Sequence, residues 1–121
     1  MIYESVLDVE SKVAPGVVFS VLRMSFARRL NLMRAIRELA GKAEFLSAGK
    51  DAGEQMDAAL IQFEIHRLYI KWGLRSISGL ELDGKTATPE LLTECGPEAL
   101  FREALESVRA QTGLYEAERK N

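Results

Sequence analysis

The stretch Glu54–Trp72, "EQMDAALIQFEIHRLYIKW", is the part of this sequence that decides the fold. It is rich in strong helix formers and contains neither glycine nor proline, so it predicts one long helix that ends near Gly73. Placed at about 100° per residue, its apolar side chains form two stripes on opposite sides of the helix. One stripe is Met56, Ala59, Leu60, Phe63 and Ile70, and the other is Ala58, Ile61, Ile65, Leu68, Tyr69 and Trp72.

Two opposed apolar stripes are difficult to cover in a chain of 121 residues. One interpretation is a central core helix that the chain covers on both sides, and the other is that a second subunit or another protein completes one face. The sequence pattern does not decide which of the two apolar stripes would be exposed. We predict a homo-oligomer and place the partner or oligomer contact on Ile61, Ile65, Leu68, Tyr69 and Trp72.

The sequence before this stretch predicts a second long helix, with Ser25 as its N-cap and with repeated apolar spacing up to about Leu46. This helix is cationic within an acidic protein, because it holds several arginines and few acids. An acidic flank of a partner helix would meet such arginines favourably. We therefore add Arg28, Arg34 and Arg37 to the predicted contact surface.

Turn and cap residues predict the remaining elements. Strands near Ser5–Glu10 and Val17–Arg23, separated by Pro15-Gly16, predict a β-hairpin. Asp83-Gly84 suits a tight turn. Two Pro-started helices follow, the first from Pro89 to Gly96 and the second from Pro97 to Gly113.

Together these elements predict a mainly α fold: a small helical domain with two long helices, a shorter C-terminal helix and a minor N-terminal β-hairpin. We expect one domain over residues 1–121, with the possible β-hairpin in residues 1–24, a helical body in residues 25–113 and a polar tail in residues 114–121. The predicted core consists of Leu30, Met33, Ile36, Leu39, Phe63, Ile70, Leu100, Phe101 and Leu105.

Few side chains in this sequence suggest a catalytic or metal site. The only histidine, His66, has neither a serine nucleophile motif nor a second metal ligand with it. The only cysteine, Cys95, has no CxxC partner and no base beside it. We favour a surface or interface histidine and a semi-buried bystander cysteine, and we expect no enzyme activity, no cofactor and no metal.

Charge and hydropathy narrow the range of partners. The formal net charge of −2 and the pI near 5.5 give no overall attraction to nucleic acid or to an anionic membrane. The arginines of the first long helix are scattered around it, whereas a surface that follows phosphates would have them in one row. No stretch reaches about 18 uncharged apolar residues, and no secretory leader is evident, so we expect a cytoplasmic protein without membrane contact.

The C-terminal part of the chain, from Tyr69 to Asn121, has a distinct order of turns and helix starts. Its landmarks are Trp72-Gly73-Leu74, Gly79-Leu80, Asp83-Gly84, Pro89-Glu90-Leu91-Leu92, Gly96-Pro97 and the terminal Glu118-Arg119-Lys120-Asn121. In these landmarks it resembles the C-terminal half of small tail assembly chaperones and allied proteins of long-tailed bacteriophages. The N-terminal half adds little to the resemblance.

This resemblance implies a mainly helical protein without enzyme activity, acting in the cytoplasm of the bacterial host of a phage or prophage. It further implies binding to the tape-measure protein and recruitment of tail-tube subunits during tail assembly. The family supplies no fixed catalytic or ligand residues to transfer to this chain. Two alternatives are a minor virion protein, such as a tail or head completion protein, and a small cytosolic regulator that binds nucleic acid through the arginine-rich helix.

Overall fold

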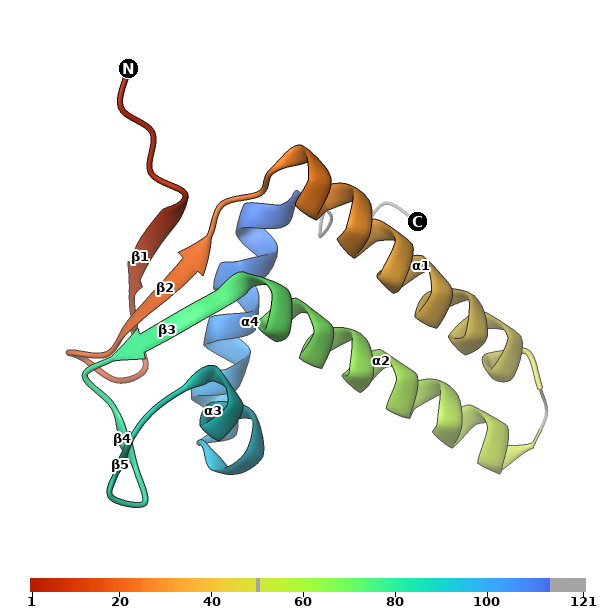
Figure 1. Ribbon diagram of the computed structural model, residues 1–121. Helices are drawn as coiled ribbons and strands as arrows, with labels where there is room; N and C mark the ends of the chain where they lie inside the picture. Colours follow the sequence, from red (N-terminus) through yellow and green to blue (C-terminus); the bar gives the residue numbers. More distant parts are fainter. Residues whose placement is uncertain (50, 114–121) are drawn as a thin grey trace. The chain divides into compact units, whose positions relative to one another are not determined.

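The computed structural model describes residues 1–49 and 51–113 (Figure 1). The predicted polar tail, residues 114–121, lies outside the described residues. In chain order the elements are β1 (Val6–Glu10), β2 (Val18–Leu22), α1 (Phe26–Ser47), α2 (Ala52–Gly73), β3 (Leu74–Ser78), β4 (Glu81–Leu82), β5 (Lys85–Thr86), α3 (Pro89–Cys95) and α4 (Glu98–Thr112). The predicted mainly α fold with a minor β part is confirmed.

The described residues divide into two compact units. The first combines the described parts of Met1–Met24 and Tyr69–Asn121, and the second is the segment Ser25–Leu68. The boundary between the units falls inside α2, so this helix contributes residues to both. The prediction of a single domain remains a prediction.

The first unit is built on an antiparallel sheet in the order β1-β2-β3. Val9 lies opposite Phe19, and Phe19 lies opposite Ile77. The predicted hairpin of β1 and β2 is confirmed, but β3 was not predicted as its third strand. β3 begins at the residue after α2 ends, so no loop separates the helix from the strand.

Helix α4 packs on one face of this sheet (Figure 1). Phe19 and Val21 of β2 are buried, as are Leu100, Leu105 and Val108 of α4. Because alternate residues of a strand point to opposite faces, Phe19 and Val21 belong to the same buried face. The predicted core positions Leu100 and Leu105 are confirmed as buried.

The last turn of α2 lies close to α4 within the same unit. A Cβ atom added at Gly73 would lie 2.3 Å from Cγ1 of Val108, so glycine is required for this approach. One turn earlier, the guanidinium carbon of Arg109 lies 5.2 Å from the ring centroid of Tyr69, which is a cation–π distance. Tyr69 and Ile70 are accordingly buried.

Turns and caps follow the local chemistry that the sequence predicted. The Ser25 side chain accepts a hydrogen bond from the backbone N–H of Arg28 at 3.2 Å and caps α1. Thr88 caps α3 in the same way through the N–H of Leu91, at 3.1 Å. The β4–β5 turn has positive φ angles at Asp83 and Gly84, of 52° and 78°, as a tight hairpin turn requires.

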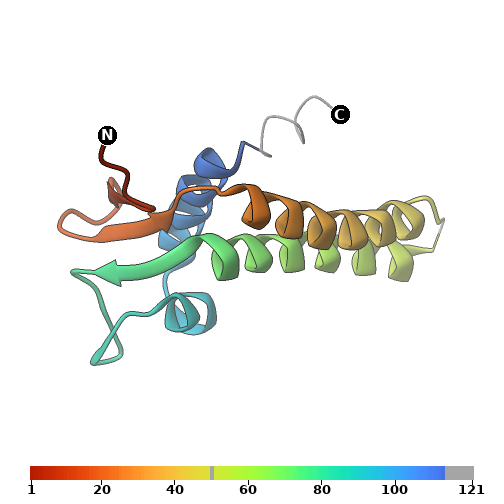
Figure 2. The same ribbon diagram turned by 45° about the horizontal axis from the view of Figure 1, so that its top comes forward.

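The second unit is a hairpin of α1 and the larger part of α2. The two helices run side by side in opposite directions, as both views show (Figures 1 and 2). Leu32 and Ala43 of α1 and Ala58 and Ile65 of α2 are buried in this unit. The connection spans residues 48–51, of which Lys50 lies outside the described residues.

Candidate protein-interaction surface

The buried side of each long helix follows a seven-residue repeat. Among the buried and half-buried positions, those that follow this repeat are Leu32, Ile36, Leu39, Ala43 and Leu46 on α1, and Ala58, Ile61, Ile65 and Leu68 on α2. Both series advance by alternating steps of three and four residues, which is the spacing of a coiled-coil seam. The α1–α2 hairpin therefore uses one apolar stripe of each helix for its own packing.

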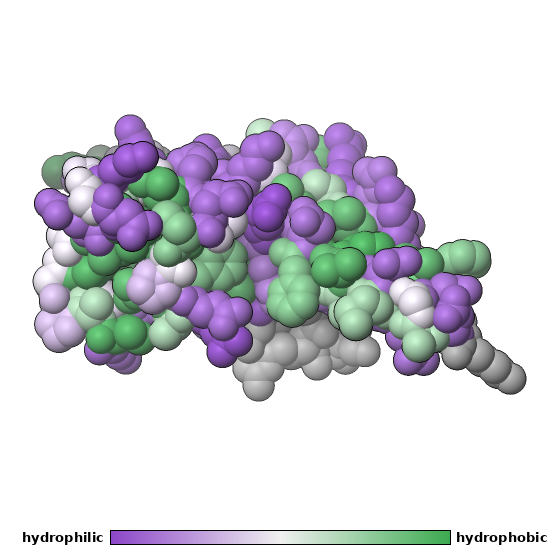
Figure 3. Space-filling model, turned by 90° about the horizontal axis from the view of Figure 1, so that it is seen from below, coloured by the Kyte–Doolittle hydropathy of each residue, from purple (hydrophilic) through white to green (hydrophobic). Residues whose placement is uncertain are grey.

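The other apolar stripe of α2 is exposed. Met56, Leu60 and Phe63 have exposed fractions of 64%, 54% and 64%, and they lie on the side of the helix opposite the seam. We call these three residues the outer row of α2. Hydrophobic side chains are visible along the hairpin in the space-filling view from below (Figure 3). The prediction that Phe63 belongs to the core is wrong, because the neighbouring seam residues supply the contact with α1.

Helix α1 also leaves apolar side chains exposed. Phe26, Leu30 and Met33 are spaced four and three residues apart, so they share one face of the helix. The predictions that Leu30 and Met33 are core residues are therefore wrong. The seam at Leu32 and Ile36 explains this result, since a helix in a two-helix hairpin buries only one stripe.

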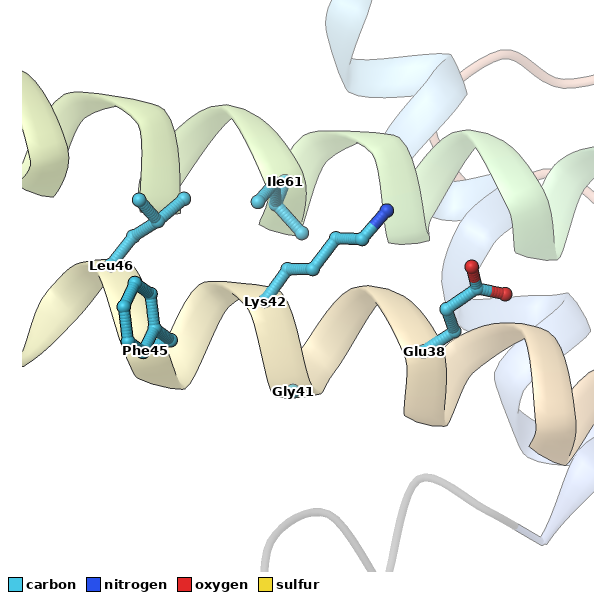
Figure 4. A pocket seen from close by; sticks show the side chains of 6 residues that line it. All are labelled: Glu38, Gly41, Lys42, Phe45, Leu46 and Ile61. Carbon is cyan, nitrogen blue, oxygen red and sulfur yellow. The ribbon is translucent and has the colours of Figure 1, made fainter.

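A groove opens along one side of α1 and reaches α2, within the hairpin unit. Its volume is about 500 Å³, and it is lined by Glu38, Gly41, Lys42, Phe45, Leu46 and Ile61. Figure 4 shows Leu46 and Ile61 directed toward the space between the helices, with the long side chain of Lys42 beside them. Gly41 leaves open space where a side chain would stand, because no atom lies within 4 Å of a Cβ added there. Phe45 is 79% exposed and provides an apolar wall.

The structure separates the apolar residues that we assigned to a partner contact. Ile65 and Tyr69 have exposed fractions of 4% and 0%, so their assignment to an accessible contact surface is wrong. Ile61, Leu68 and Trp72 are half-buried, and Ile61 contributes to the groove. The stripe that contains them is the seam side of α2, whereas the outer row is the accessible side.

The three predicted arginines do not form one patch. Arg34 and Arg37 are exposed and lie one helical turn apart, while Arg28 is half-buried. Arg28 lies about 120° around the helix from Arg34, because the two are six residues apart. Arg34 shares the helix face of Glu38 and Gly41 and so extends the edge of the groove.

The only histidine and the only cysteine of the chain lie in different helices. His66 is half-buried in α2, and its ring meets the Phe63 ring edge-on with centroids 6.0 Å apart. Cys95 is exposed at the end of α3, not semi-buried as predicted, and its thiol donates a hydrogen bond to the carbonyl oxygen of Leu91 at 3.3 Å. Among the described residues, no group of three or more histidines, cysteines or acids could hold a metal ion.

One carboxylate organises the loop between β1 and β2. The Glu103 side chain of α4 accepts hydrogen bonds from the Ser11 hydroxyl, from the backbone N–H of Lys12 at 2.7 Å and from that of Val13 at 3.3 Å. Partial burial raises the pKa of Glu103, but these hydrogen bonds and the Lys12 charge outweigh that effect and hold its pKa below the usual range. Glu103 therefore fixes a loop and is not a candidate general acid.

Comparison with known proteins finds no matching family model, no matching curated protein and no matching solved structure. Within residues 1–49 and 51–113, none of the helices has the length and apolar character needed to cross a membrane.

The candidate protein-interaction surface consists of the groove along α1 and the outer row of α2. The sequence signal for distinguishing the two stripes of α2 was Arg67, which interrupts the repeat of the outer row, whereas the seam repeat continues without a charge from Ala58 to Leu68.

Proposed function

We propose that this protein is a tail assembly chaperone of a long-tailed phage or prophage, which holds a helical segment of the tape-measure protein and recruits tail-tube subunits. The observation that carries this proposal is the apolar groove along α1, bounded by Phe45, Leu46 and Ile61. The resemblance of the C-terminal part of the sequence to such chaperones supports the same function. A protein of this kind acts by reversible contact with other chains, for which exposed apolar surface is the required feature.

The groove fits an amphipathic helix. Apolar residues of such a partner would enter beside Phe45 and over the space left by Gly41, and their burial would supply most of the affinity. Arg34 at the edge of the groove would meet an acidic residue on the flank of the partner. This contact would contribute mainly to orientation and association rate, because it stays exposed to water.

The test is co-expression with the tape-measure protein encoded in the same genome, followed by capture at low and moderate salt. Gly41→Phe fills the groove without removing any contact, since nothing lies near a Cβ at this position. We expect Gly41→Phe to reduce capture by at least about fivefold. Gly41→Ala is the matched control, because a methyl group leaves most of the groove open and should leave capture within about twofold.

A charge variant tests the second contact. Arg34→Glu should slow association by about threefold and weaken its dependence on salt, whereas Arg102→Glu, which reverses an exposed charge on α4, should change neither. Absence of a tape-measure gene from the genome, or full capture by Gly41→Phe, would overturn the proposal. Recovery of the protein in purified virions would instead favour a minor structural component of the particle.

A further inference from the structure

The outer row of α2 is an apolar surface that the groove does not use. Met56, Leu60 and Phe63 cover about two turns of α2, and the His66 ring meets the Phe63 ring edge-on. They face away from the seam, so the hairpin itself does not cover them.

Along this part of α2, the acidic residues come before the basic residue. The charged residues from Ala52 to Leu68 are Glu54, Asp57 and Glu64, followed by Arg67. Asp57 is exposed near one end of the outer row, and Arg67 is exposed at the other end. The row therefore has an acidic end at Asp57 and a basic end at Arg67, with the exposed Glu64 on the flank between Phe63 and Arg67.

A surface with this order complements itself when it is turned end over end. Two α2 helices that meet antiparallel, with the symmetry axis near residue 62, bring Asp57 of each copy opposite Arg67 of the other. Leu60 and Phe63 of both copies then meet at the centre. A parallel arrangement would place Asp57 beside Asp57 and Arg67 beside Arg67, and such like-charge contacts are unfavourable.

We infer that the outer row of α2 binds a second copy of this chain, in an antiparallel two-fold dimer with Leu60 and Phe63 at its centre and paired Asp57–Arg67 contacts at both ends. This inference is independent of the proposed function, because it uses the side of α2 that faces away from the seam and leaves the groove free. A contact limited to one helix face buries little area, so we expect a weak, concentration-dependent dimer.

Sedimentation equilibrium across a range of concentrations tests the dimer. Leu60→Glu should raise the dissociation constant by at least about tenfold, because it places a charge at the centre of the contact. Phe45→Glu is the matched control: it removes an exposed apolar residue of the groove and should leave the dimer unchanged while weakening capture of a tape-measure segment. Circular dichroism verifies that each variant remains helical, since both side chains are exposed. A wild-type chain that stays monomeric at about 1 mM overturns the inference.

A charge exchange tests the pairing of the two ends. Asp57→Arg and Arg67→Asp should each weaken the dimer by about tenfold, since each substitution affects both ends of a two-fold contact. The double variant restores opposite charges and should return the dissociation constant to within about threefold of wild type. Double-variant weakening equal to the product of the two single effects would overturn the proposed pairing.

Crosslinking separates the antiparallel from the parallel arrangement. In a Cys95→Ser background, a mixture of Asp57→Cys and Arg67→Cys chains should form a disulfide between the two different variants under a mild oxidant. Each variant alone should crosslink much less, because equal positions lie far apart in the antiparallel pair. Efficient self-crosslinking of Asp57→Cys, or species larger than a dimer, would overturn the two-fold arrangement.

Discussion

At the residue scale, Glu103 shows how one side chain connects distant parts of a chain. Its carboxylate accepts hydrogen bonds from three donors in Ser11, Lys12 and Val13, which lie 90 to 92 positions away in the sequence. Ser11 is buried, and its hydroxyl also accepts the N–H of Ala14 at 2.9 Å. The loop between β1 and β2 is therefore organised by one acid on α4.

The pH dependence of stability should reveal this contact. The pKa of Glu103 is lower in the folded chain than in the unfolded chain, so its contribution is complete above the ordinary glutamate pKa of about 4.3 and is lost as the pH falls through the folded value. Glu103→Gln should lower the free energy of unfolding by roughly 1 kcal/mol at pH 7. The difference from wild type should shrink toward pH 3, as urea unfolding at several pH values will measure.

Glu98→Gln is the control for this prediction. Glu98 is exposed and pairs with Arg102 at 3.5 Å on the surface of the same helix, so its loss should cost no more than about 0.5 kcal/mol. An equal effect of the two substitutions at pH 7, or a Glu103→Gln effect that persists unchanged at pH 3, would contradict the role given to Glu103.

At the element scale, helix α2 shows what the sequence could and could not predict. Its length and its two stripes were visible in the pattern, and the cap residues fixed the limits of α1 and α3 closely. The stripe that faces α1 was assigned to a partner, because both stripes are apolar and helical periodicity alone does not rank them. The charge of Arg67 within the outer row would have ranked them. The third strand was missed because α2 runs into β3 without a turn residue.

Two glycines in long helices should respond in opposite ways to the same substitution. Gly73→Ala should destabilise the protein by about 1–3 kcal/mol, because its methyl group would meet Val108 of α4. Gly41→Ala should stabilise it by about 0.5–1 kcal/mol, because its surroundings are open and alanine favours a helix. Thermal unfolding of both variants measures the contrast.

A compensating variant makes the Gly73 prediction specific. Val108→Ala removes the methyl groups that Gly73→Ala would meet, so the double variant should lose less stability than the sum of the two single variants. Strict additivity would show that the loss at Gly73 arises elsewhere. A stabilising Gly73→Ala would show that α2 and α4 adjust without cost.

At the scale of the whole molecule, the two units bury apolar side chains in different ways. Phe19 and Val21 are completely buried in β2, which has a strand on each side and α4 on one face. The hairpin of α1 and α2 buries one stripe per helix and leaves Phe26, Leu60 and Phe63 exposed. Composition and periodicity predicted the mainly α fold, but they did not predict this unequal burial, which depends on contacts between residues far apart in sequence.

Hydrogen exchange should distinguish the two units. We expect amide hydrogens of β2 to exchange at least about tenfold more slowly than those in the middle of α1, because local opening of a two-helix hairpin exposes less apolar surface than opening of the sheet. Exchange followed by mass spectrometry at low protein concentration, where the dimer is absent, makes the comparison. Equal protection of both segments would indicate one cooperative unit.

The direct junction between α2 and β3 constrains how the length of the hairpin can vary during evolution. A helix turns by about 100° per residue, so inserting one residue into α2 would rotate every seam position before the insertion relative to the seam positions after it. An insertion of seven residues nearly restores the phase, provided that α1 gains the same number and the turn is displaced as a whole. We therefore expect hairpin lengths among homologous chains to differ by matched heptads, and the steps of three and four from Leu32 to Leu46 should continue through the added turns.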